Sequence, residues 1–325
     1  MPMISVIVPT FNRAHYLQGA LETLAAQETD CRFSYEILVV DNASKDDTRT
    51  VVRRFAETSP VPVRYLYESK PGDAPPRNRG IRESHGQWLA FFDDDQFAPP
   101  RWLLSLLTAA QRHNCLVLGG PVHLDLKESV ITKLSPACRS TLREMQPYRG
   151  DQPYVAGAAP GTGNLLVSRQ VFDRVGLFAE DLKGGGSDWH LIQKARSEGI
   201  SPWYAADAGI RHRVEPNRMT PEYFRWDATN GGVAQADTDY RQHGAAGLLM
   251  RCLLRASRSA GYLPGHLLSR IRKSVCGATQ SSMICWRTTG YLRRCLTILA
   301  PDLFPQKQFH ESTNFRTGRS VGVKS

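Results

Sequence analysis

The sequence predicts an α/β protein with a mixed sheet that is covered by helices on both faces, and with a basic helical extension at its C-terminal end. Three observations support this fold class. Short apolar runs rich in β-branched residues alternate with segments of helical periodicity over the first 120 residues. Polar clusters directly follow several of these runs, as they do at the ligand-binding edge of a parallel sheet. After residue 244 the chain has 13 lysine and arginine residues against 2 acidic residues, whereas the rest is nearly neutral.

Each expected strand is a short apolar run bounded by polar or turn residues. The first run is β-branched, and residues 88–92 are apolar throughout, as in a strand that is buried on both faces. Gly119-Gly120-Pro121 ends the fifth run. The expected strands cover residues 4–9, 36–40, 61–67, 88–92, 116–118 and 164–167.

The expected helices connect these strands. Leu17, Leu21 and Leu24 recur at helical spacing, the Asp46-Asp47 pair favours a helix N-terminus, and Pro99 suits the first turn of a helix. The expected helices cover residues 14–27, 46–55, 75–84, 99–112, 187–197 and 221–242. Residues 121–155 are expected to form long loops with one short helix.

These patterns divide the chain into three predicted parts. Residues 1–242 form the α/β domain, residues 243–305 form two or three basic amphipathic helices, and residues 306–325 form a disordered polar tail. The leucines and arginines that interleave after residue 247 are typical of helices in an anionic membrane interface. The alternative is that the leucines pack on the catalytic domain while the arginines are solvated. No nucleic-acid recognition motif or aromatic interleaving is present, so we expect no nucleic-acid partner.

The sequence favours a cytoplasmic location, peripheral to a membrane. Its seven cysteines are odd in number and none is spaced C-x-x-C, which argues against a disulfide framework or a zinc site. The opening residues MPMISVIVPTF lack the basic region of a signal peptide, and no stretch approaches the ~18 apolar residues that span a bilayer.

Three adjacent carboxylates, Asp93-Asp94-Asp95, follow the apolar run 88–92. Like charges this close raise one another's pKa unless a cation is present. Carboxylate oxygens suit Mg²⁺ or Mn²⁺, which usually keeps open positions for substrate phosphates. The run therefore predicts a metal that bridges to a diphosphate. The alternative is a helix N-cap cluster or a solvated acidic turn.

Four further polar residues have both a functional and a structural interpretation. Asp41 follows the second strand and could accept hydrogen bonds from a nucleobase imide or a ribose, or could simply cap a turn. Arg77 could contact a base carbonyl or phosphate, or lie on an exposed helix face. Asp188 follows a glycine run and could be a general base or an N-cap. His212 could bind the metal or the diphosphate, or be structural.

In their order and spacing, seven segments of the chain resemble the family 2 glycosyltransferases, which are inverting enzymes of the GT-A fold. The resemblance runs from about residue 4 to residue 234. The segments are SVIVPTFNRAHYL, EILVVDNASKDDT, PPRNRGI, WLAFFDDDQFAPPRWL, GTGNLLVSRQVFDRVGLF, GGGSDWHLIQKA and HRVEPNRMTPEYF. It implies a metal-dependent enzyme that moves one sugar from a nucleotide-diphosphate donor to a glycan or lipid-linked acceptor in polysaccharide or cell-surface glycan biosynthesis. A UDP-sugar is the favoured donor.

The resemblance also implies roles for individual residues. Asp188 matches the family's general base. The donor-nucleotide residues are expected to be Pro9, Thr10, Asn12, Arg13, Asp41, Arg77, Asp93 and Asp94. Mn²⁺ or Mg²⁺ is expected on Asp95, Asp93 and His212, and the acceptor loop on Gly186, Ser187, Trp189 and His190.

Two departures from the family pattern keep other functions open. Ser187 stands where the family usually has Glu, and His190 stands where it has Asp. A non-catalytic relative that binds nucleotide sugar or glycan is therefore the main alternative. A nucleotidyltransferase would need a glycine-rich basic loop after the first strand, which residues 10–13 do not provide. Residues 222–226 imitate the Q-x-x-R-W motif of processive synthases, and we interpret them as part of a structural helix.

Overall fold

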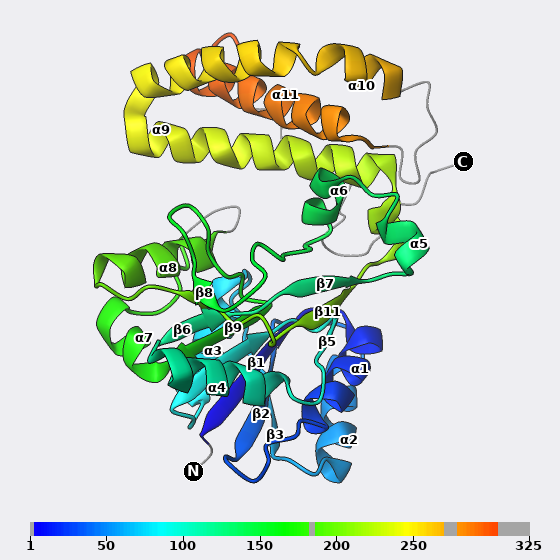
Figure 1. The fold of residues 1–325 in the computed structure, drawn as a ribbon, viewed down its shortest axis with the longest axis vertical. Helices are drawn as coiled ribbons and strands as arrows, with labels where there is room; N and C mark the ends of the chain where they lie inside the picture. The colour runs from blue at the N-terminus through cyan, green and yellow to red at the C-terminus, as the bar shows by residue number, and fades with distance from the viewer. Residues whose placement is uncertain (1–2, 182–185, 270–277, 305–325) are drawn as a thin grey trace. The chain divides into compact units, whose positions relative to one another are not determined.

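A mixed sheet of eight strands organises the first unit of the protein in this computed structural model, which describes residues 3–181, 186–269 and 278–304. The strands lie in the order β3-β2-β1-β4-β9-β6-β10-β8 (Figure 1). Their bounds are β1 Ile4–Thr10, β2 Tyr35–Asp41, β3 Val63–Tyr67, β4 Trp88–Phe92, β6 Val117–Gly119, β8 Gln152–Pro153, β9 Asn164–Ser168 and β10 Trp203–Tyr204. β1 pairs in parallel with both β2 and β4, whereas β9 runs antiparallel between β4 and β6.

Helices cover both faces of this sheet because successive strand residues point to opposite sides. Ile4, Val6 and Val8 of β1 pack with α1, α2 and α4, and Ile7 packs with α3 on the other face. The helices are α1 Ala14–Ala25, α2 Thr48–Thr58, α3 Ala74–Glu83, α4 Trp102–His113, α7 Arg169–Val175 and α8 Ser187–Ser197. The predicted α/β fold with a mixed sheet is confirmed.

Residues 121–155 are more regular than predicted. They contain β7 Val122–Asp125 and the short helices α5 Glu128–Ile131 and α6 Pro136–Thr141, in addition to β8. Two more short strands, β5 Gln96–Phe97 and β11 Ile210–Arg213, pair with each other in antiparallel fashion. Strands this short have too few residues to show a period of two, so the sequence pattern did not predict them.

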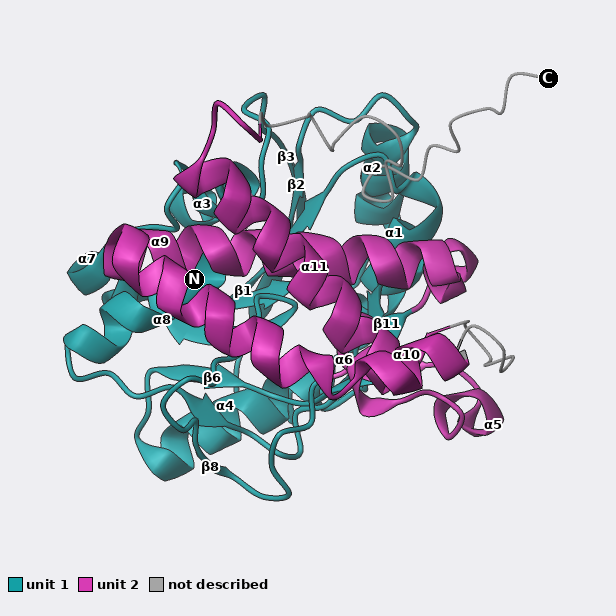
Figure 2. Ribbon diagram, turned by 90° about the horizontal axis from the view of Figure 1, so that it is seen from above, with its two compact units in different colours: residues 1–123, 145–213 teal, residues 124–144, 214–325 magenta. Residues whose placement is uncertain are grey.

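The second unit comprises residues 124–144 and 214–325, and residues 1–123 and 145–213 form the first (Figure 2). Its main helices are α9 Pro221–Ala260, α10 Leu263–Ser269 and α11 Gln280–Leu299, preceded by the 3-10 helix η1 Pro216–Met219. The Gly231-Gly232 pair did not prevent helix formation. A Cβ at Gly232 would collide with the Arg287 carbonyl, and one at Gly290 with the Thr229 carbonyl, so these two glycines let α9 and α11 approach closely.

The division into units does not coincide with the predicted boundary after residue 242. Residues 214–242 belong to the second unit, where Tyr223 and Phe224 pack in a core with Leu134 and Met283. α9 is kinked at Gly244, whose φ of 63° is left-handed, so a bend does occur two residues beyond the predicted boundary. Both aromatic residues of the core lie in the segment that imitates Q-x-x-R-W. The predicted tail, residues 306–325, lies outside the described residues.

No helix in the described part of the chain is long and apolar enough to cross a membrane.

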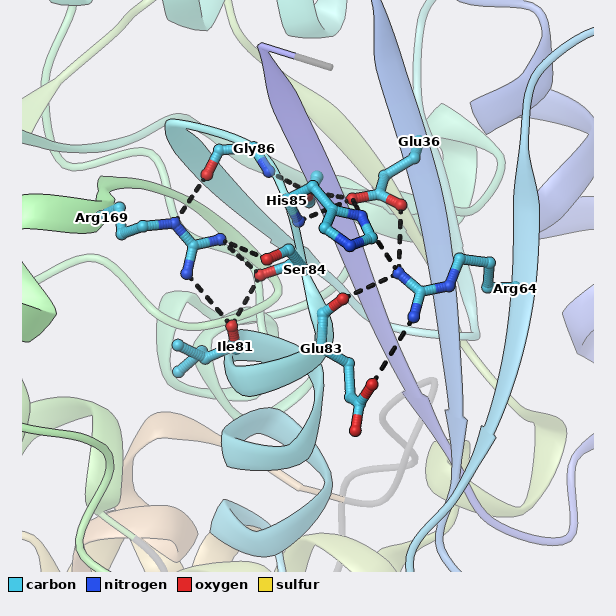
Figure 3. A network of polar contacts seen from close by, with 9 residues as sticks. Glu36, Arg64, Ile81, Glu83, Ser84, His85, Gly86 and Arg169 are labelled. Atoms are coloured by element: carbon cyan, nitrogen blue, oxygen red, sulfur yellow. Dashed lines mark hydrogen bonds and ion pairs between the residues drawn. The ribbon is translucent and has the colours of Figure 1, made fainter. Parts of the chain in front are cut away.

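A buried polar network joins the N-terminal ends of β1 and β2 to the end of α3 (Figure 3). Glu36 accepts hydrogen bonds from the Ser5 hydroxyl at 2.7 Å and the His85 backbone N–H at 2.9 Å, and it lies 3.4 Å from Arg64. Arg169 donates to the carbonyls of Ile81, Ser84 and Gly86, and thereby satisfies groups that the end of α3 leaves free. This network holds the strands at the end opposite to their polar rim.

Replacing Glu36 with glutamine is expected to lower the free energy of unfolding by about 1.5–3 kcal/mol at neutral pH, because charge-assisted hydrogen bonds are lost. Burial alone would raise the pKa of Glu36, but the bonds from His85 and Ser5 and the nearby charges of His85 and Arg64 outweigh burial and lower it. Because its pKa is lowered, Glu36 stabilises the fold at pH values above the ordinary Glu pKa of ~4.3. This stabilisation is lost as the pH falls through the folded-state pKa. Urea unfolding of both proteins between pH 3 and 7 should therefore show a difference that shrinks in acid.

Glu83→Gln is the matched control, because Glu83 also pairs with Arg64 but its side chain is 34% exposed. It should lower stability by less than about 1 kcal/mol. Equal losses for Glu36→Gln and Glu83→Gln would contradict the assignment of this network to Glu36.

Candidate active site

The predicted polar clusters meet at the carboxyl ends of β1, β2 and β4. Thr10 is the last residue of β1 and pairs in register with Asp41, the last residue of β2. Pro9 precedes Thr10 in the same strand, and Asp93 follows directly on β4, the other neighbour of β1. Parallel pairing therefore brings Asp41 and Asp93, which are 31 and 83 positions from Thr10 in the sequence, to the same rim of the sheet as Thr10.

Asp41 is held in place by two hydrogen bonds. Its Oδ1 accepts from the Ser44 backbone N–H at 2.8 Å and its Oδ2 from the Tyr65 hydroxyl at 2.7 Å. Burial and the bond to Asp41 raise the pKa of Tyr65 to about 12, so this phenol stays protonated and keeps donating. Asn12 joins the neighbouring loops by accepting from the Lys45 N–H at 2.7 Å. The buried Asp41 carboxylate still has lone pairs for a ligand.

The three adjacent carboxylates differ in their surroundings. Asp94 and Asp95 are buried, and Arg13 Nη1 binds both, at 2.9 Å to Asp94 Oδ1 and 2.7 Å to Asp95 Oδ2. β11 carries His212 to the other oxygen of Asp95, with Nε2 at 3.5 Å from Oδ1. Asp93 keeps 37% of its side chain exposed and lies 3.9 Å from Arg77. Two carboxylates are thus compensated from within the protein, and the third faces solvent.

Protonation of the cluster is favoured by its surroundings. Burial, together with the charge of Asp95, raises the pKa of Asp94 to about 6 even though Arg13 opposes the shift. The pKa of Asp93 is also raised, again by burial and the charge of Asp95, and the solvent that reaches Asp93 weakens the effect. Arg13 and Arg77 do not fully neutralise three carboxylates, so a further cation would be stabilised here.

Several buried polar atoms at this rim have no hydrogen-bond partner among the described residues. They are Thr10 Oγ1, Arg77 Nε and His212 Nδ1. The Thr10 hydroxyl is still near enough to Asp94 to lower the pKa of that carboxyl, although it makes no hydrogen bond of good geometry. An unsatisfied buried polar group costs free energy, and a ligand or water normally satisfies it. The rim therefore has unused hydrogen-bonding capacity beside the carboxylates.

Gly163 lines the site from the loop before β9. A Cβ at this position would lie 2.7 Å from Asp93 Oδ2 and would also collide with Gln96 Nε2. Gln96 in turn accepts a hydrogen bond from the Asp93 backbone N–H at 3.2 Å. A side chain at residue 163 would therefore displace the ends of the Asp93 and Gln96 side chains.

Gly163→Ala is expected to weaken nucleotide binding at least 10-fold, about 1.4 kcal/mol, because the new methyl group displaces Asp93 and Gln96. Gly161→Ala is the matched control, since a Cβ there would meet no atom within 4 Å. Calorimetric titration of both variants checks this. Equal affinities for the two would show that the loop does not shape the site.

Residues 5–176 match the family described as Glycosyl transferase family 2. The chain belongs to glycosyltransferase family 2. The predicted family and transferase class are thereby confirmed.

Individual relatives of this glycosyltransferase support the assignment. The chain is 28% identical over 228 residues to the glycosyltransferase AglE of Haloferax volcanii, covering 69% of this chain and 72% of that protein. It is 37% identical over 230 residues to validoxylamine A glucosyltransferase of Streptomyces hygroscopicus, covering 62% of this chain and 53% of that enzyme. It spans about half the length of several curated relatives that it matches.

The fold resembles that of the mannosyltransferase PcManGT from Pyrobaculum calidifontis, a structure in complex with GDP-Man and Mn²⁺. The TM-score is 0.57 at 19% identity, covering 90% of this chain and 87% of that one. The likeness supports the GT-A fold.

The predicted acceptor residues of the glycosyltransferase lie at the start of α8. Gly186 is left-handed with φ of 89°, Ser187 is buried, Trp189 is 40% exposed and His190 is partly exposed. Asp188 Oδ1 accepts from the Trp189 backbone N–H at 2.7 Å. Within the described residues, Asp188 makes no hydrogen bond or ion pair with the carboxylates after β4. Gly184 and Gly185 lie outside the described residues.

The rim was predicted to hold a divalent cation. No three His, Cys, Asp or Glu side chains in the described part of the chain are grouped closely enough to enclose a metal ion. Asp93 and Asp95 supply oxygen ligands, the charge on the cluster is incompletely compensated, and His212 has an unpartnered nitrogen. These residues fit a Mn²⁺ or Mg²⁺ whose remaining ligands come from a diphosphate, as this type of site usually requires.

Three residues of the rim were missed in the sequence: Tyr65, Gln96 and Gly163. Tyr65 lies inside a strand, where an aromatic residue usually indicates packing. Gly163 is part of the GTGN segment, directly before a predicted strand. A glycine at that position was the sequence signal that could have indicated a loop lying close to the carboxylates.

Proposed function

We propose that this glycosyltransferase is metal-dependent and inverting, and that it moves one sugar from a nucleotide-diphosphate sugar to an acceptor hydroxyl. The observation that carries the proposal is the rim formed by Thr10, Asp41, Arg77 and the carboxylates Asp93 to Asp95, with its buried unpartnered polar atoms. The residues that would hold the nucleotide, the diphosphate and the cation lie next to one another.

Each donor residue has a defined task in this proposal. Asp41 accepts from the imide N–H of a pyrimidine base or from a ribose hydroxyl, and Arg77 donates to a base carbonyl or to phosphate. Asp93 and Asp95 would hold Mn²⁺ or Mg²⁺ with His212, and the ion supplies charge stabilisation to the leaving diphosphate. Pro9, Asn12 and Arg13 shape the same rim, with Arg13 keeping Asp94 and Asp95 in position. A hydrogen bond from a base imide N–H to Asp41 favours UDP as the nucleotide. The likeness to a structure that holds GDP-Man makes GDP the alternative nucleotide.

Asp188 is proposed to remove the proton of the acceptor hydroxyl while that oxygen attacks the anomeric carbon from the face opposite to the diphosphate. One displacement inverts the configuration and needs no covalent nucleophile on the protein. Ser187, Trp189, His190 and Gly186 surround Asp188 in the chain and are proposed to bind the acceptor, a glycan or lipid-linked saccharide of polysaccharide or cell-envelope biosynthesis.

The cellular setting is also a proposal. We place the glycosyltransferase function in residues 1–242 and assign the basic helices of residues 243–305 to peripheral contact with an anionic membrane from the cytoplasmic side. Their composition, with arginines between leucines, supports this role.

Calorimetric titration with UDP, dTDP and GDP, each with and without Mn²⁺, tests the donor site. We expect one nucleotide, UDP first, to bind at least 10-fold more tightly with Mn²⁺ than without it. If the folded protein binds none of the three in the presence of Mn²⁺, the donor-site assignment is wrong. Nucleotide binding without sugar transfer to any acceptor would instead support a binding protein built on the family's fold.

A further inference from the structure

The part of α9 beyond Gly244 has two apolar faces. One face packs inward: Leu248 is fully buried, Cys252 lies against the same core, and Arg255 stacks over the Tyr291 ring at 4.5 Å. This face contacts α11, which also contacts Ala236 in the first half of α9. Figure 1 shows the chain doubling back after the kink, with the second half of α9 in yellow and α11 in orange. The inward face accounts for the folding of this hairpin.

The opposite face of the same helix is exposed. Leu249 and Leu253, and Met250 and Leu254, are spaced four residues apart and lie on neighbouring rows of one side. Their exposed fractions lie between 47% and 61%. Packing within the second unit does not need this face, because Leu248 and Cys252 already fill the contact with α11. Large exposed apolar patches on soluble proteins generally mark interaction sites.

α10 continues the exposed surface. Its Leu263, Leu267 and Leu268 are between 51% and 60% exposed. His266 points the other way, with Nδ1 3.2 Å from the Ser282 hydroxyl and its ring edge-on to Trp286. The leucines therefore face solvent because the polar residue between them takes the contact with α11.

The charges beside this surface decide which partner fits it. Arg251 and Arg258 are exposed and lie beside Leu254 at helical spacing, and Arg251 also lies 3.9 Å from Asp239 Oδ1 and 2.8 Å from His243 Nε2. No acidic residue occurs from residue 245 to residue 301, where the sequence has nine arginines and lysines. An apolar strip bordered by arginines without acidic residues is the pattern of a helix that lies in an anionic lipid interface. A second copy of the chain would bring the arginines of two such faces together, whereas an anionic lipid surface supplies the opposite charge.

We propose that a docking face formed by Leu249, Met250, Leu253 and Leu254 of α9 and by Leu263, Leu267 and Leu268 of α10 inserts into the headgroup region of an anionic bilayer. The flanking arginines contact the lipid phosphates, and the helices lie in the plane of the surface. The proposal makes the general assignment of a membrane-contacting region specific to one face. It does not depend on sugar transfer, since lipid binding requires neither a nucleotide nor a metal.

Co-sedimentation of the full chain with lipid vesicles tests the docking face. One set of vesicles contains phosphatidylcholine and 30% phosphatidylglycerol, and the other contains phosphatidylcholine alone. We expect binding to the anionic vesicles at least 10-fold tighter than to the neutral ones. The double variant Leu249→Glu/Leu253→Glu should bind the anionic vesicles at least 10-fold more weakly than wild type. Arg258→Gln should weaken the preference for anionic lipid, and it leaves the pairing of Arg251 with Asp239 intact.

Val155→Glu is the control for an added surface charge, because Val155 is 60% exposed in the first unit and the change adds one negative charge, as Leu267→Glu does. It should bind vesicles as wild type does. Leu267→Glu in α10 provides a second test of the face should the double variant not fold, as judged by circular dichroism. UDP affinity is measured in parallel, so failure of the donor site is distinguished from failure of the docking face.

Three outcomes would overturn the proposal. The first is wild-type protein that binds neither kind of vesicle. The second is a folded Leu249→Glu/Leu253→Glu variant that binds anionic vesicles as wild type does. The third is a wild-type dimer that the double variant converts to a monomer, without vesicle binding by either, which would make the face an interface between copies.

Discussion

Replacing Asp188 with asparagine is expected to lower kcat for sugar transfer by about 10²–10⁴-fold, the usual contribution of a general base. Asparagine has the same size and its Oδ1 can still accept from the Trp189 N–H, which holds the aspartate at 2.7 Å. It cannot take a proton from the acceptor hydroxyl. The expected result is therefore a loss of turnover with the nucleotide dissociation constant within about 2-fold of wild type, or 0.4 kcal/mol.

The environment of Asp188 supports this selective effect. The side chain is partly exposed at the start of α8, next to the left-handed Gly186. Ser187 is buried and has no carboxylate, so it offers no substitute base in the variant. Transfer rates are measured with the donor that the nucleotide titrations identify.

Asp173→Asn is the control for the Asp188 experiment. Asp173 is an exposed carboxylate on α7 and its loss removes the same charge from the same unit. It should leave kcat unchanged. Wild-type turnover in Asp188→Asn would rule out Asp188 as the base, and a parallel loss of nucleotide binding would show that its role is structural.

The meeting of Thr10, Asp41 and Asp93 at one rim could be predicted because it follows from the order of the strands. Apolar runs ending in Thr10, Asp41 and Asp93 predicted parallel strands, and parallel strands bring their carboxyl ends together. The side-chain pairing within that rim could not be predicted. Arg13 reaches Asp94 and Asp95 across 81 and 82 residues, and only the folded loop after β1 sets that distance.

The other features that the sequence did not predict also have physical causes. β5 has two residues and β11 has four, so neither shows a clear alternation, yet their pairing delivers His212 to Asp95. The segment of α8 that carries Asp188 was predicted with the bounds it has, residues 187–197. Its distance from the donor rim depends on tertiary structure, about which helical periodicity contains no information.

Replacing Asp95 with asparagine is expected to remove the effect of Mn²⁺ on nucleotide binding, a loss of at least 100-fold or about 2.7 kcal/mol with the metal present. Asp95 is the carboxylate that the cluster would offer to the ion together with His212, whose Nε2 lies 3.5 Å from Oδ1. Without the metal the affinity of wild type and variant should be similar. The fold should persist because Arg13 keeps its bond to Asp94 at 2.9 Å.

Asp94→Asn separates metal binding from simple loss of charge. Asp94 and Asp95 are equally buried, both bind Arg13 and they differ in that His212 is within ion-pair distance of Asp95. Calorimetric titration with and without Mn²⁺ should show Asp94→Asn changing the nucleotide affinity by the same factor in both conditions. If both variants lose the metal effect equally, the carboxylates act as one electrostatic cluster and Asp95 has no special place in it. If neither loses it, the cation binds elsewhere, and the pairing of Asp95 with Arg13 is its whole role.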